Sequence, residues 1–400
     1  MDSIYRNLRE IYNAKDGIQL FRATMSEERF VSLKSMVRFD DRLRRNRDDK
    51  LAPVREVVDM MNSVLLDVYE PGPFLTVDEM LVEFHGRVGF RQYIPTKPGK
   101  FGIKVYWIVD AATTMPLRLL VYIGSNTLAQ SELACSNTVP EAVVWHLAEP
   151  YLKKGRNITL DNYFTSHALG ERLMKEKTTI VGTIRNNRRE IPHQAKSTVG
   201  RVRGDLRHFY AENATLASCW NKKTPVLLYS TMHGRQQDNV DDKGNIIRFY
   251  NETKGGVDTL DKLVRTHRAT RKCARWSYGI VMTLADVAVV ASMKLMGKEN
   301  KHYEYKRELA YQLCDNLIKK RITIPHLRSG VPSAIELLNY KFPKPSTRSN
   351  EASKRLIGRC IFCARDQDRK SRRKCSTCEK FCPEHSFALK YVECPNCYAT

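Results

Sequence analysis

The chain has 400 residues, and its 67 Lys and Arg against 44 Asp and Glu give it a formal net charge of +23 at pH 7. A chain of this length can form about two or three domains with cores of their own. The excess positive charge favours a polyanionic partner, because each neutralised phosphate releases a counterion; a basic surface on a soluble protein is the alternative. No run of about 18 apolar residues is evident, so no membrane span is expected, and the N-terminus lacks the features of a secretory signal.

The first half of the chain passes from helical to strand-like patterns. Residues 1 to about 70 are expected to be helical, with Ser26 as a capping residue and apolar residues at the helical period in 54–67. Beyond them, β-rich segments separated by turn residues predict antiparallel strands at 74–84, 90–94, 101–110 and 117–123. A helix at 140–152, a strand at 157–160, a helix at 165–177 and a strand at 179–184 follow. This order indicates an α/β sheet with active groups near strand ends.

The second half begins with a segment that interrupts this pattern. Residues from about 186 to 248 are irregular, basic and poor in strand signals except at 225–231, so we interpret them as an insertion. Its first part, 185–207, has seven Lys or Arg against two acidic residues, which suits either DNA contact or a solvated loop. Helices are then expected at 257–268, 277–297 and 303–321, followed by a Pro/Ser-rich linker at 341–350.

Three aspartates, Asp78, Asp161 and Asp258, stand at the edges of segments that are predicted to be regular. Carboxylates from distant parts of a chain can converge to hold two divalent metal ions that activate water in phosphodiester cleavage. Each also has an ordinary interpretation, as a surface strand residue, a partner of a helix N-terminus and a helix cap respectively. Their shared setting favours a metal site, because a carboxylate in an apolar strand costs free energy unless it is paired or metal-bound. Asp261 lies one helical turn after Asp258 and is a candidate auxiliary residue.

Other polar residues are assigned lesser roles. Asp110 ends a strand, where a turn role is favoured over that of a fourth ligand, and Asp286 in an apolar helix is expected to face solvent or to be paired. The sequence has no P-loop, dinucleotide-binding glycine motif or Ser/His/Asp signature, which disfavours ATPases, dehydrogenases and serine hydrolases.

The C-terminal tail has the spacing of a zinc-binding module. Ligands separated by two intervening residues can present both of their donor atoms to one tetrahedral zinc ion. The candidate ligands are Cys360, Cys363, Cys375, Cys378, Cys382, His385, Cys394 and Cys397. They suffice for two structural Zn²⁺ ions in a segment that is too short to fold well without metal. A cross-braced arrangement would join the first pair to the third and the second to the fourth; sequential pairing is the alternative.

Several motifs in order resemble the piggyBac-type DDE/D transposases. They include Thr76-Val-Asp78-Glu, Arg91 to Pro98, Asn157-Ile-Thr-Leu-Asp161-Asn-Tyr-Phe, Lys254-Gly-Gly-Val-Asp258 and Arg275-Trp276. The resemblance covers nearly the whole chain. It implies an α/β RNase H-like catalytic core with an inserted β-rich domain, a flanking helical domain and a small cross-braced two-zinc tail that recognises transposon ends. Family members usually have a longer N-terminus with an acidic leader, so the helical domain is expected to be incomplete here.

The resemblance also implies a division of the chain into domains. The expected parts are 1–72 and 268–340 for helical dimerisation and DNA binding, 73–186 and 248–267 for the catalytic core, 187–247 for the insertion, 341–356 for a linker and 357–400 for the zinc domain.

The function implied by the resemblance is DNA transposition. Asp78, Asp161 and Asp258 would hold two Mg²⁺ or Mn²⁺ ions in a nuclear homodimer that cuts double-stranded DNA, passes through hairpin ends and joins DNA at TTAA. The basic stretches supply candidate DNA-contacting residues: Arg188, Arg189, Lys262, Arg265, Arg268, Arg271, Lys272, Arg275 and Trp276. Trp276 equally suits the core of the helix that follows. Basic tracts at 354–355 and 369–374 suit nuclear import or DNA contact.

Two other functions fit the sequence. The chain could be a catalytically silent, host-adopted DNA-binding or chromatin protein that keeps the fold and the zinc tail. Alternatively, the tail could serve as a protein-interaction or ubiquitin-transfer module.

Overall fold

The computed structural model describes residues 7–13, 15–124, 127–128, 138–220, 224–234, 245–266, 268–269, 273–298, 301–324, 327, 330–342, 358–359 and 370–371. The chain divides into two compact units, Met1–Lys341 and Phe342–Thr400. Of the second unit, the structure describes a short antiparallel pair, β10 (Gly358–Arg359) and β11 (Lys370–Ser371). The eight predicted zinc ligands lie outside the described residues. The domain boundaries within the first unit remain predictions.

The N-terminal segment forms the expected helices. They are α2 (Leu8–Ile11), α3 (Gln19–Thr24), α4 (Glu27–Met36) and α5 (Arg55–Val68). Ser26 caps α4, since its Oγ accepts a hydrogen bond from the backbone nitrogen of Arg29 at 3.3 Å. Asn62 of α5 binds both backbone groups of Leu119, at 2.8 and 3.1 Å. This pairing satisfies part of the outer edge of strand β4 (Pro116–Val121).

A single mixed sheet forms the centre of the first unit. The remaining strands are β1 (Phe74–Glu83), β2 (Gln92–Tyr93), β3 (Phe101–Asp110), β5 (Asn157–Leu160), β6 (Thr179–Thr183), β7 (Leu206–Tyr210), β8 (Thr215–Trp220) and β9 (Pro225–Ser230). Their order is β2-β3-β1-β5-β6-β9-β8-β7, and β4 also pairs with β3. β1 is antiparallel to β3 but parallel to β5, which in turn is parallel to β6. The α/β sheet predicted from the strand and helix order is therefore confirmed.

The expectation that residues 186–248 are poor in strands is wrong. β7, β8 and β9 form an antiparallel ladder that joins the central sheet where β9 pairs with β6. The sequence Leu206-Arg-His-Phe-Tyr210 has no clear apolar alternation, so its strand character depends on partners elsewhere in the chain. The β-rich insertion implied by the family resemblance agrees with these strands. The segment also contains the short helix α9 (His193–Lys196), and the unpredicted helix α10 (Asn245–Thr253) begins inside it.

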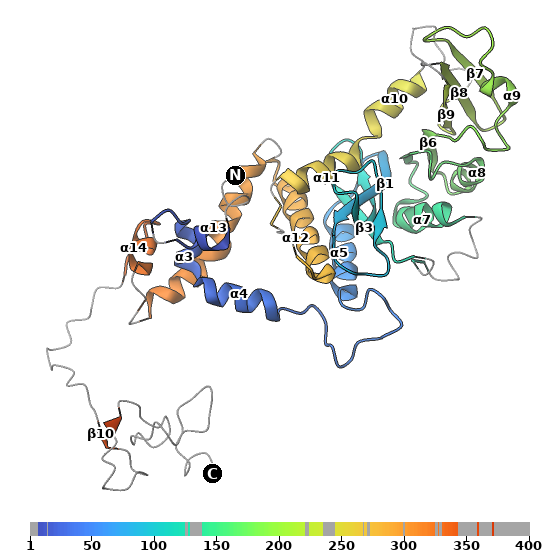
Figure 1. Cartoon of the computed structure of the whole chain (residues 1–400). Helices are drawn as coiled ribbons and strands as arrows, with labels where there is room; N and C mark the ends of the chain where they lie inside the picture. The colour runs from blue at the N-terminus through green and yellow to red at the C-terminus, as the bar shows by residue number, and fades with distance from the viewer. Residues whose placement is uncertain are drawn as a thin grey trace. The chain divides into compact units, whose positions relative to one another are not determined.

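Helices cover the sheet on both sides (Figure 1). α7 (Val139–Ala148), which runs into the 3₁₀ turn η1 (Glu149–Tyr151), contacts β3 and β4, and α8 (His167–Lys175) contacts β6. α10 leads from β9 to α11 (Gly256–Thr266), which packs on β1 and β3. α12 (Trp276–Leu295) contacts α11, β1 and α13 (His302–Ile322), whereas α13 and α14 (Val331–Glu336) contact α3.

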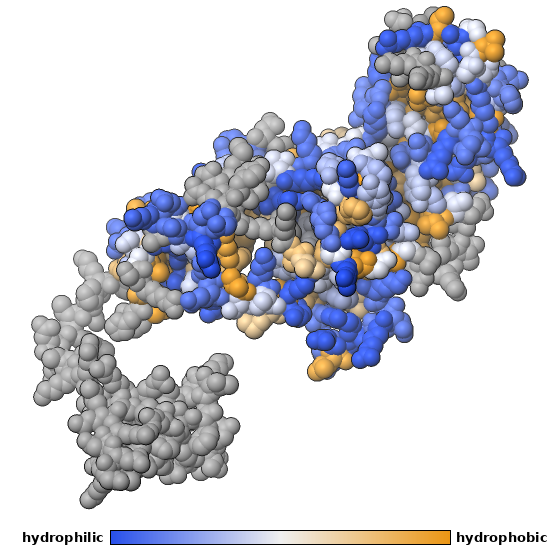
Figure 2. Space-filling model, viewed as in Figure 1, coloured by the Kyte–Doolittle hydropathy of each residue, from blue (hydrophilic) through white to orange (hydrophobic). Residues whose placement is uncertain are grey.

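Buried apolar side chains fill the space between these layers. Trp107, Tyr106, Phe164 and Leu75 are among the largest side chains that are fully buried. On the face drawn in Figure 2, hydrophilic residues cover most of the described surface and the apolar residues are scattered among them. The sheet therefore supplies the main core, as expected for a mixed α/β layer structure.

Among the described helices, α12 is long and apolar enough to cross a membrane by length and composition. No membrane span was expected from the sequence, and this helix was not identified as a candidate. Length and composition alone do not distinguish such a segment from a core helix, and α12 has the contacts of one. Val287 and Val290 are fully buried, and the buried Asp286 pairs with Lys306 of α13 and accepts a hydrogen bond from the backbone nitrogen of Ala269 at 2.8 Å. Asp286 is therefore paired, as one of its two sequence interpretations proposed.

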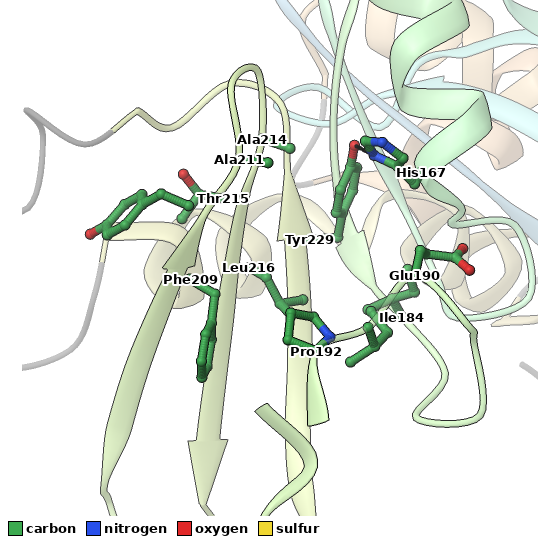
Figure 3. A pocket seen from close by; sticks show the side chains of 12 residues that line it. His167, Ile184, Glu190, Pro192, Phe209, Ala211, Ala214, Thr215, Leu216 and Tyr229 are labelled. Atoms are coloured by element: carbon green, nitrogen blue, oxygen red, sulfur yellow. Dashed lines mark hydrogen bonds between the residues drawn. The ribbon is translucent and has the colours of Figure 1, made fainter. Parts of the chain in front are cut away.

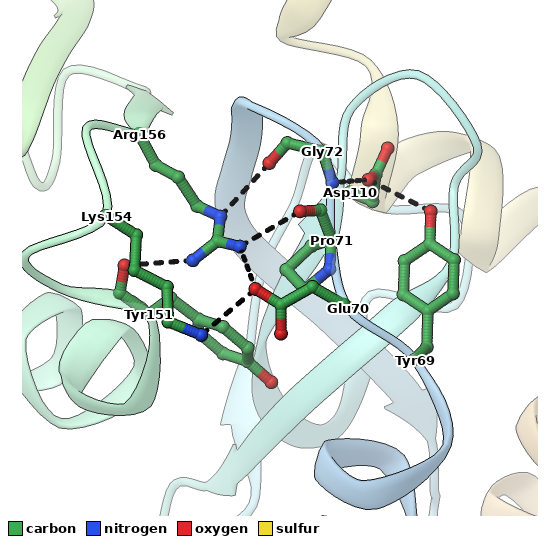
Figure 4. Close-up of polar contacts among 8 residues, drawn as sticks. All are labelled: Tyr69, Glu70, Pro71, Gly72, Asp110, Tyr151, Lys154 and Arg156. Atoms are coloured by element: carbon green, nitrogen blue, oxygen red, sulfur yellow. Dashed lines mark hydrogen bonds and ion pairs between the residues drawn. The ribbon is translucent and has the colours of Figure 1, made fainter.

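Two buried polar groups fix the turn that leads into β1 (Figure 4). Arg156 is 6% exposed, donates hydrogen bonds to the carbonyl oxygens of Gly72, Pro71 and Tyr151, and pairs with Glu70. On the other side of the turn, Asp110 accepts a hydrogen bond from the backbone nitrogen of Gly72 at 2.8 Å.

Asp110 also stabilises the turn at its own end of β3. Its carboxylate accepts hydrogen bonds from the backbone nitrogens of Ala112 and Thr113 at 2.9 and 3.0 Å and from the hydroxyl of Tyr69 at 3.2 Å. Its turn role is therefore confirmed.

Replacement of Arg156 by Met should lower the free energy of unfolding by roughly 2–4 kcal/mol, because it leaves several buried carbonyl oxygens without a donor. Lys154→Met is the matched control, since Lys154 also pairs with Glu70, at 3.0 Å, but is exposed. It should cost roughly 0.5 kcal/mol or less. Urea unfolding followed by circular dichroism measures both, and equal losses would contradict the structural role of Arg156.

Candidate active site

Asp78 and Asp161 occupy neighbouring positions on adjacent parallel strands. The paired register of β1 and β5 ends with Val77 opposite Leu160, and each aspartate is the next residue of its strand or strand end. Parallel strands lie about 4.8 Å apart, and paired positions point to the same face of the sheet. The charge of Asp161 accordingly contributes to the shifted pKa of Asp78. The structure thus brings these two predicted residues together.

Asp258 reaches the same region through the close packing of α11 on the sheet. It lies in the first turn of α11, two residues after the buried Gly256. A Cβ atom at Gly256 would come within 2.6 Å of Cγ2 of Val109 and 3.3 Å of Cβ of Thr76. Glycine is required here because any side chain would push the helix away from β1 and β3. This contact explains the second glycine of the Gly255-Gly256 motif.

Three buried threonines tie the elements that carry the aspartates. Thr76 Oγ1 donates a hydrogen bond to the carbonyl oxygen of Thr253 at 2.6 Å, and the hydroxyls of Thr159 and Thr253 lie 2.7 Å apart. Thr253 Oγ1 donates to the carbonyl oxygen of Phe249 at 2.7 Å, so Thr159 is the donor of the hydroxyl pair. These residues were not predicted as part of the site. The available signal was a threonine two residues before Asp78 and another two before Asp161.

The carboxylates on the two strands are held by local backbone groups. Asp78 Oδ1 accepts a hydrogen bond from the backbone nitrogen of Glu79 at 2.7 Å, and Asp161 Oδ1 accepts one from that of Tyr163 at 2.9 Å. Burial raises the pKa of Asp78 to about 7, with further contributions from the charges of Glu79 and Asp161. Burial also raises the pKa of Asp161. Both side chains are therefore costly to ionise without a cation nearby.

This donor set fits a divalent metal ion of the Mg²⁺ or Mn²⁺ type. Such ions prefer carboxylate oxygens, and their charge would offset the cost of ionising Asp78 and Asp161. Among the described residues, however, no three Asp, Glu, His or Cys side chains come together closely enough to hold a metal ion. Asp258 instead has a side chain that is 67% exposed, and its Oδ1 lies 3.3 Å from Nζ of Lys97. Lys97 was not predicted as a site residue.

Asp261 is engaged by a basic neighbour. Its Oδ1 accepts a hydrogen bond from Nε of Arg265 at 2.8 Å, and Nη2 of Arg265 donates to the carbonyl oxygen of Leu81 at 3.1 Å. The pair therefore joins α11 to β1 beside the three aspartates. The proposed auxiliary role of Asp261 remains a prediction.

The predicted DNA-contacting residues fall into two groups. Arg268 pairs with Glu83 at 3.0 Å, and Arg275 donates to the carbonyl oxygens of Ser35 and Val37 at 2.9 and 2.8 Å, near the C-terminus of α4. The ring of Trp276 meets that of Phe90 edge to face, with centroids 5.2 Å apart. These side chains have structural partners inside the chain.

The described members of the second group are exposed or half-buried, and Arg268 of the first group is exposed too. Arg189 and Lys262 are exposed, and Arg188 is half-buried with Nη2 at 3.5 Å from the carbonyl oxygen of Thr165. Arg271 and Lys272 lie outside the described residues. Lys262 lines an open groove of about 650 Å³ that Lys97, Asp258 and Asp261 also line.

A separate cavity of about 220 Å³ lies between the insertion strands and the start of α8 (Figure 3). Its lining is mostly apolar, with Phe209, Leu216 and Pro192 among its residues. Nδ1 of His167 lies 2.9 Å from the hydroxyl of Tyr229 at one side of it. None of the predicted site residues lines this cavity, so the aspartate site is distinct from it.

Asp78→Asn should stabilise the metal-free protein, and more so at high pH. A carboxyl whose pKa rises from 3.8 to about 7 on folding costs stability that grows as the pH increases across that interval. In EDTA at pH 8 we expect the free energy of unfolding to rise by about 1–2 kcal/mol, after allowance for partial solvation, with little change at pH 4. Thermal unfolding at both pH values measures this, with the exposed Asp67→Asn as control. An equal gain at both pH values would contradict the burial argument.

The comparisons with known proteins agree with this arrangement. Residues 2–293 match the family model DDE_Tnp_1_7, described as Transposase IS4. The chain is 24% identical over 275 residues to human PiggyBac transposable element-derived protein 3, an alignment that covers 64% of this chain and 46% of that protein. It is 22% identical over 281 residues to human PiggyBac transposable element-derived protein 2, covering 66% and 47%. The chain thus spans about half the length of these relatives.

A solved structure extends the similarity over more of the chain. The cryo-EM structure of a piggyBac transposase synaptic complex with hairpin DNA superposes with a TM-score of 0.79 at 29% identity, covering 99% of this chain and 85% of the other. The matched family model, the relatives and this fold together show that the chain belongs to the piggyBac-type transposase family.

Proposed function

We propose that the chain is the catalytic part of a DNA transposase that cleaves and joins phosphodiester bonds with Asp78, Asp161 and Asp258 as ligands of two divalent metal ions. The observation that carries this proposal is the register of β1 and β5, which sets Asp78 beside Asp161. The strand order β4-β3-β1-β5-β6, with β1, β5 and β6 parallel and β3 antiparallel to β1, supports an RNase H-like core. DDE transposases in general use divalent metal ions, and this donor set suits them.

The residues of the site would act by holding the metal ions and by orienting their aspartate ligands. When bound, two divalent ions supply an activated oxygen nucleophile and stabilise the leaving oxygen. Asp78 and Asp161 would hold their charge in a partly dehydrated setting, where electrostatic interactions with reacting groups are strong. Thr76, Thr159 and Gly256 would position the three ligands without touching the substrate.

The partners follow from the same proposal. Double-stranded DNA would bind along the exposed basic side chains, including Arg189 and Lys262. The solved neighbour is a synaptic complex with hairpin DNA, which supports DNA as the partner. The homodimer belongs to this proposal through the family resemblance. TTAA target choice, the two-zinc tail as a reader of DNA ends and a nuclear location belong to this proposal through the family resemblance.

A catalytically silent DNA-binding protein is the second candidate. The pairing of Asp258 with Lys97 favours it, because in this conformation the third carboxylate is engaged by a basic side chain rather than grouped with the other two.

Nicking of supercoiled plasmid DNA in Mn²⁺ or Mg²⁺ separates the two candidates. For an active enzyme, Asp161→Asn should lower the rate by roughly a hundredfold or more, because it removes a ligand charge needed in the transition state. Asp67→Asn, an exposed substitution on α5, should leave the rate unchanged. If the native protein binds DNA without cutting it, or if Asp161→Asn cuts equally well, the enzymatic proposal fails.

The two groups of candidate DNA-contacting residues should affect DNA affinity differently. The double substitution of Arg189 and Lys262 by Gln should weaken binding and reduce the slope of log Kd against log salt by about 1.8, or about 0.9 for each lost phosphate contact. Arg275→Gln should instead lower the melting temperature with little change in that slope, because its guanidinium binds backbone carbonyl groups. Fluorescence anisotropy with labelled DNA at several salt concentrations measures both. A larger slope change for Arg275→Gln would contradict this division.

A further inference from the structure

We propose that Lys97 is the internal counter-ion of the acidic site in the metal-free protein and is displaced from Asp258 when a divalent metal ion binds. This inference rests on the proposed function, because it takes Asp78, Asp161 and Asp258 as the metal ligands.

The first support is the position of the ammonium group. Nζ of Lys97 lies 3.3 Å from Oδ1 of Asp258 and 3.2 Å from the carbonyl oxygen of Glu79. Its side chain is 17% exposed, although Asp258 itself is 67% exposed. The lysine therefore links the first turn of α11 to β1 from within the site, next to the residue that follows Asp78.

The loop between β2 and β3 holds this lysine in place. The backbone nitrogen of Lys97 donates to the carbonyl oxygen of Ile94 at 3.2 Å, and the nitrogen of Ile94 donates to the carbonyl oxygen of Lys100 at 2.7 Å. Pro95 and Pro98 stand on either side of the lysine and restrict the backbone. The loop is thus built to aim one long cationic side chain at the acidic residues.

The charges around Lys97 agree with this role. Burial by itself would lower the pKa of Lys97, but the carboxylates of Asp78, Asp258 and Glu79 raise it above its ordinary value. Of the other charged groups near the site, Lys104 lies 3.9 Å from Glu79, Asp161 adds negative charge next to Asp78, and the charge of Arg185 opposes the upward pKa shift of Asp161. The acidic side chains still outnumber the basic ones, so removal of Lys97 increases the repulsion among them.

A metal ion and this ammonium group compete for the same carboxylate. A divalent ion carries twice the charge and can bind several oxygens at once, whereas the ammonium is a single compact charge. The described residues hold no three ligands close together, so Asp258 has to move toward Asp78 and Asp161 to complete a metal site. That movement breaks its contact with Lys97. The ammonium then has room in the groove of about 650 Å³ that it lines with Lys262 and Asp258.

The test is metal binding and stability of the full chain, without DNA. Mn²⁺ affinity is measured by the electron paramagnetic resonance signal of free Mn²⁺, and thermal unfolding is measured in EDTA and in Mn²⁺. Lys97→Met should bind Mn²⁺ about three- to tenfold more tightly than the native protein, should melt at a lower temperature in EDTA and should gain more from added Mn²⁺. Lys262→Met is the matched control: it removes the same charge from the same groove without breaking a contact to Asp258, and should change the affinity less.

Lys97→Gln keeps a hydrogen-bond donor without the charge, and should follow Lys97→Met even if the methionine variant folds poorly. Weaker Mn²⁺ binding by both variants would overturn the proposal, since Lys97 would then hold Asp258 in its metal-binding position. An affinity equal to that of Lys262→Met would overturn it as well. If the native protein itself binds no Mn²⁺ and cuts no DNA, the proposed function fails. If the native protein binds Mn²⁺ but substitution of Lys97 does not change the affinity, only the inference about Lys97 is refuted.

Discussion

Hydrogen bonds among three buried threonines determine where the candidate site can form. Thr76 lies on β1, Thr159 on β5 and Thr253 at the end of α10. The carbonyl oxygen of Thr253 accepts a hydrogen bond from the hydroxyl of Thr76, and its hydroxyl accepts one from that of Thr159. Buried polar groups must find partners, so a shift of α10 and α11 along the sheet would leave several of them unsatisfied. Thr76 and Thr159 precede Asp78 and Asp161 by two residues and therefore share their face of the sheet. The position of Asp258 then follows, because Gly256 allows α11 to touch that same face.

The parts of the fold that could be predicted from the sequence are those whose own side chains carry the pattern. β1, β3 and β5 are rich in apolar and β-branched residues, and their bounds agree closely with expectation because burial on the sheet favours such residues. β7 could not be predicted in this way. Its neighbourhood depends on Arg201, whose fully buried guanidinium binds Asp205 at 2.9 Å and Ser218 at 2.6 Å. A buried arginine resembles a surface residue in sequence until the groups that satisfy it are known.

The residues of the candidate site also differ in whether the sequence could predict them. The three aspartates could be proposed because motifs and strand ends mark them, and the pairing of β1 with β5 supplies the geometry for two of them. Lys97 could not be proposed, since its partner Asp258 is 161 residues away and the contact exists only once the β2–β3 loop and α11 are in place. The two prolines around it were a local sign of a fixed loop, but they do not indicate its target. Long-range pairs of opposite charge are set by topology rather than by spacing along the chain.

Because some basic residues bind groups within the protein, the net charge is a limited guide to which external partners the protein binds. Part of the positive charge is used inside the protein: Arg156 and Arg201 are buried, Arg265 binds Asp261, and Arg275 binds carbonyl groups near the end of α4. Transfer of a basic side chain from its carboxylate partner to a phosphate costs less free energy when that carboxylate finds another cation. In the proposed function the two external partners are a divalent cation and a polyanion, and each would take one member of an internal pair. Binding of metal at Asp258 would release Lys97, and a phosphate in the groove would stabilise the released ammonium. The ion pair at this site would therefore couple metal binding to DNA binding, because either event lowers the cost of the other.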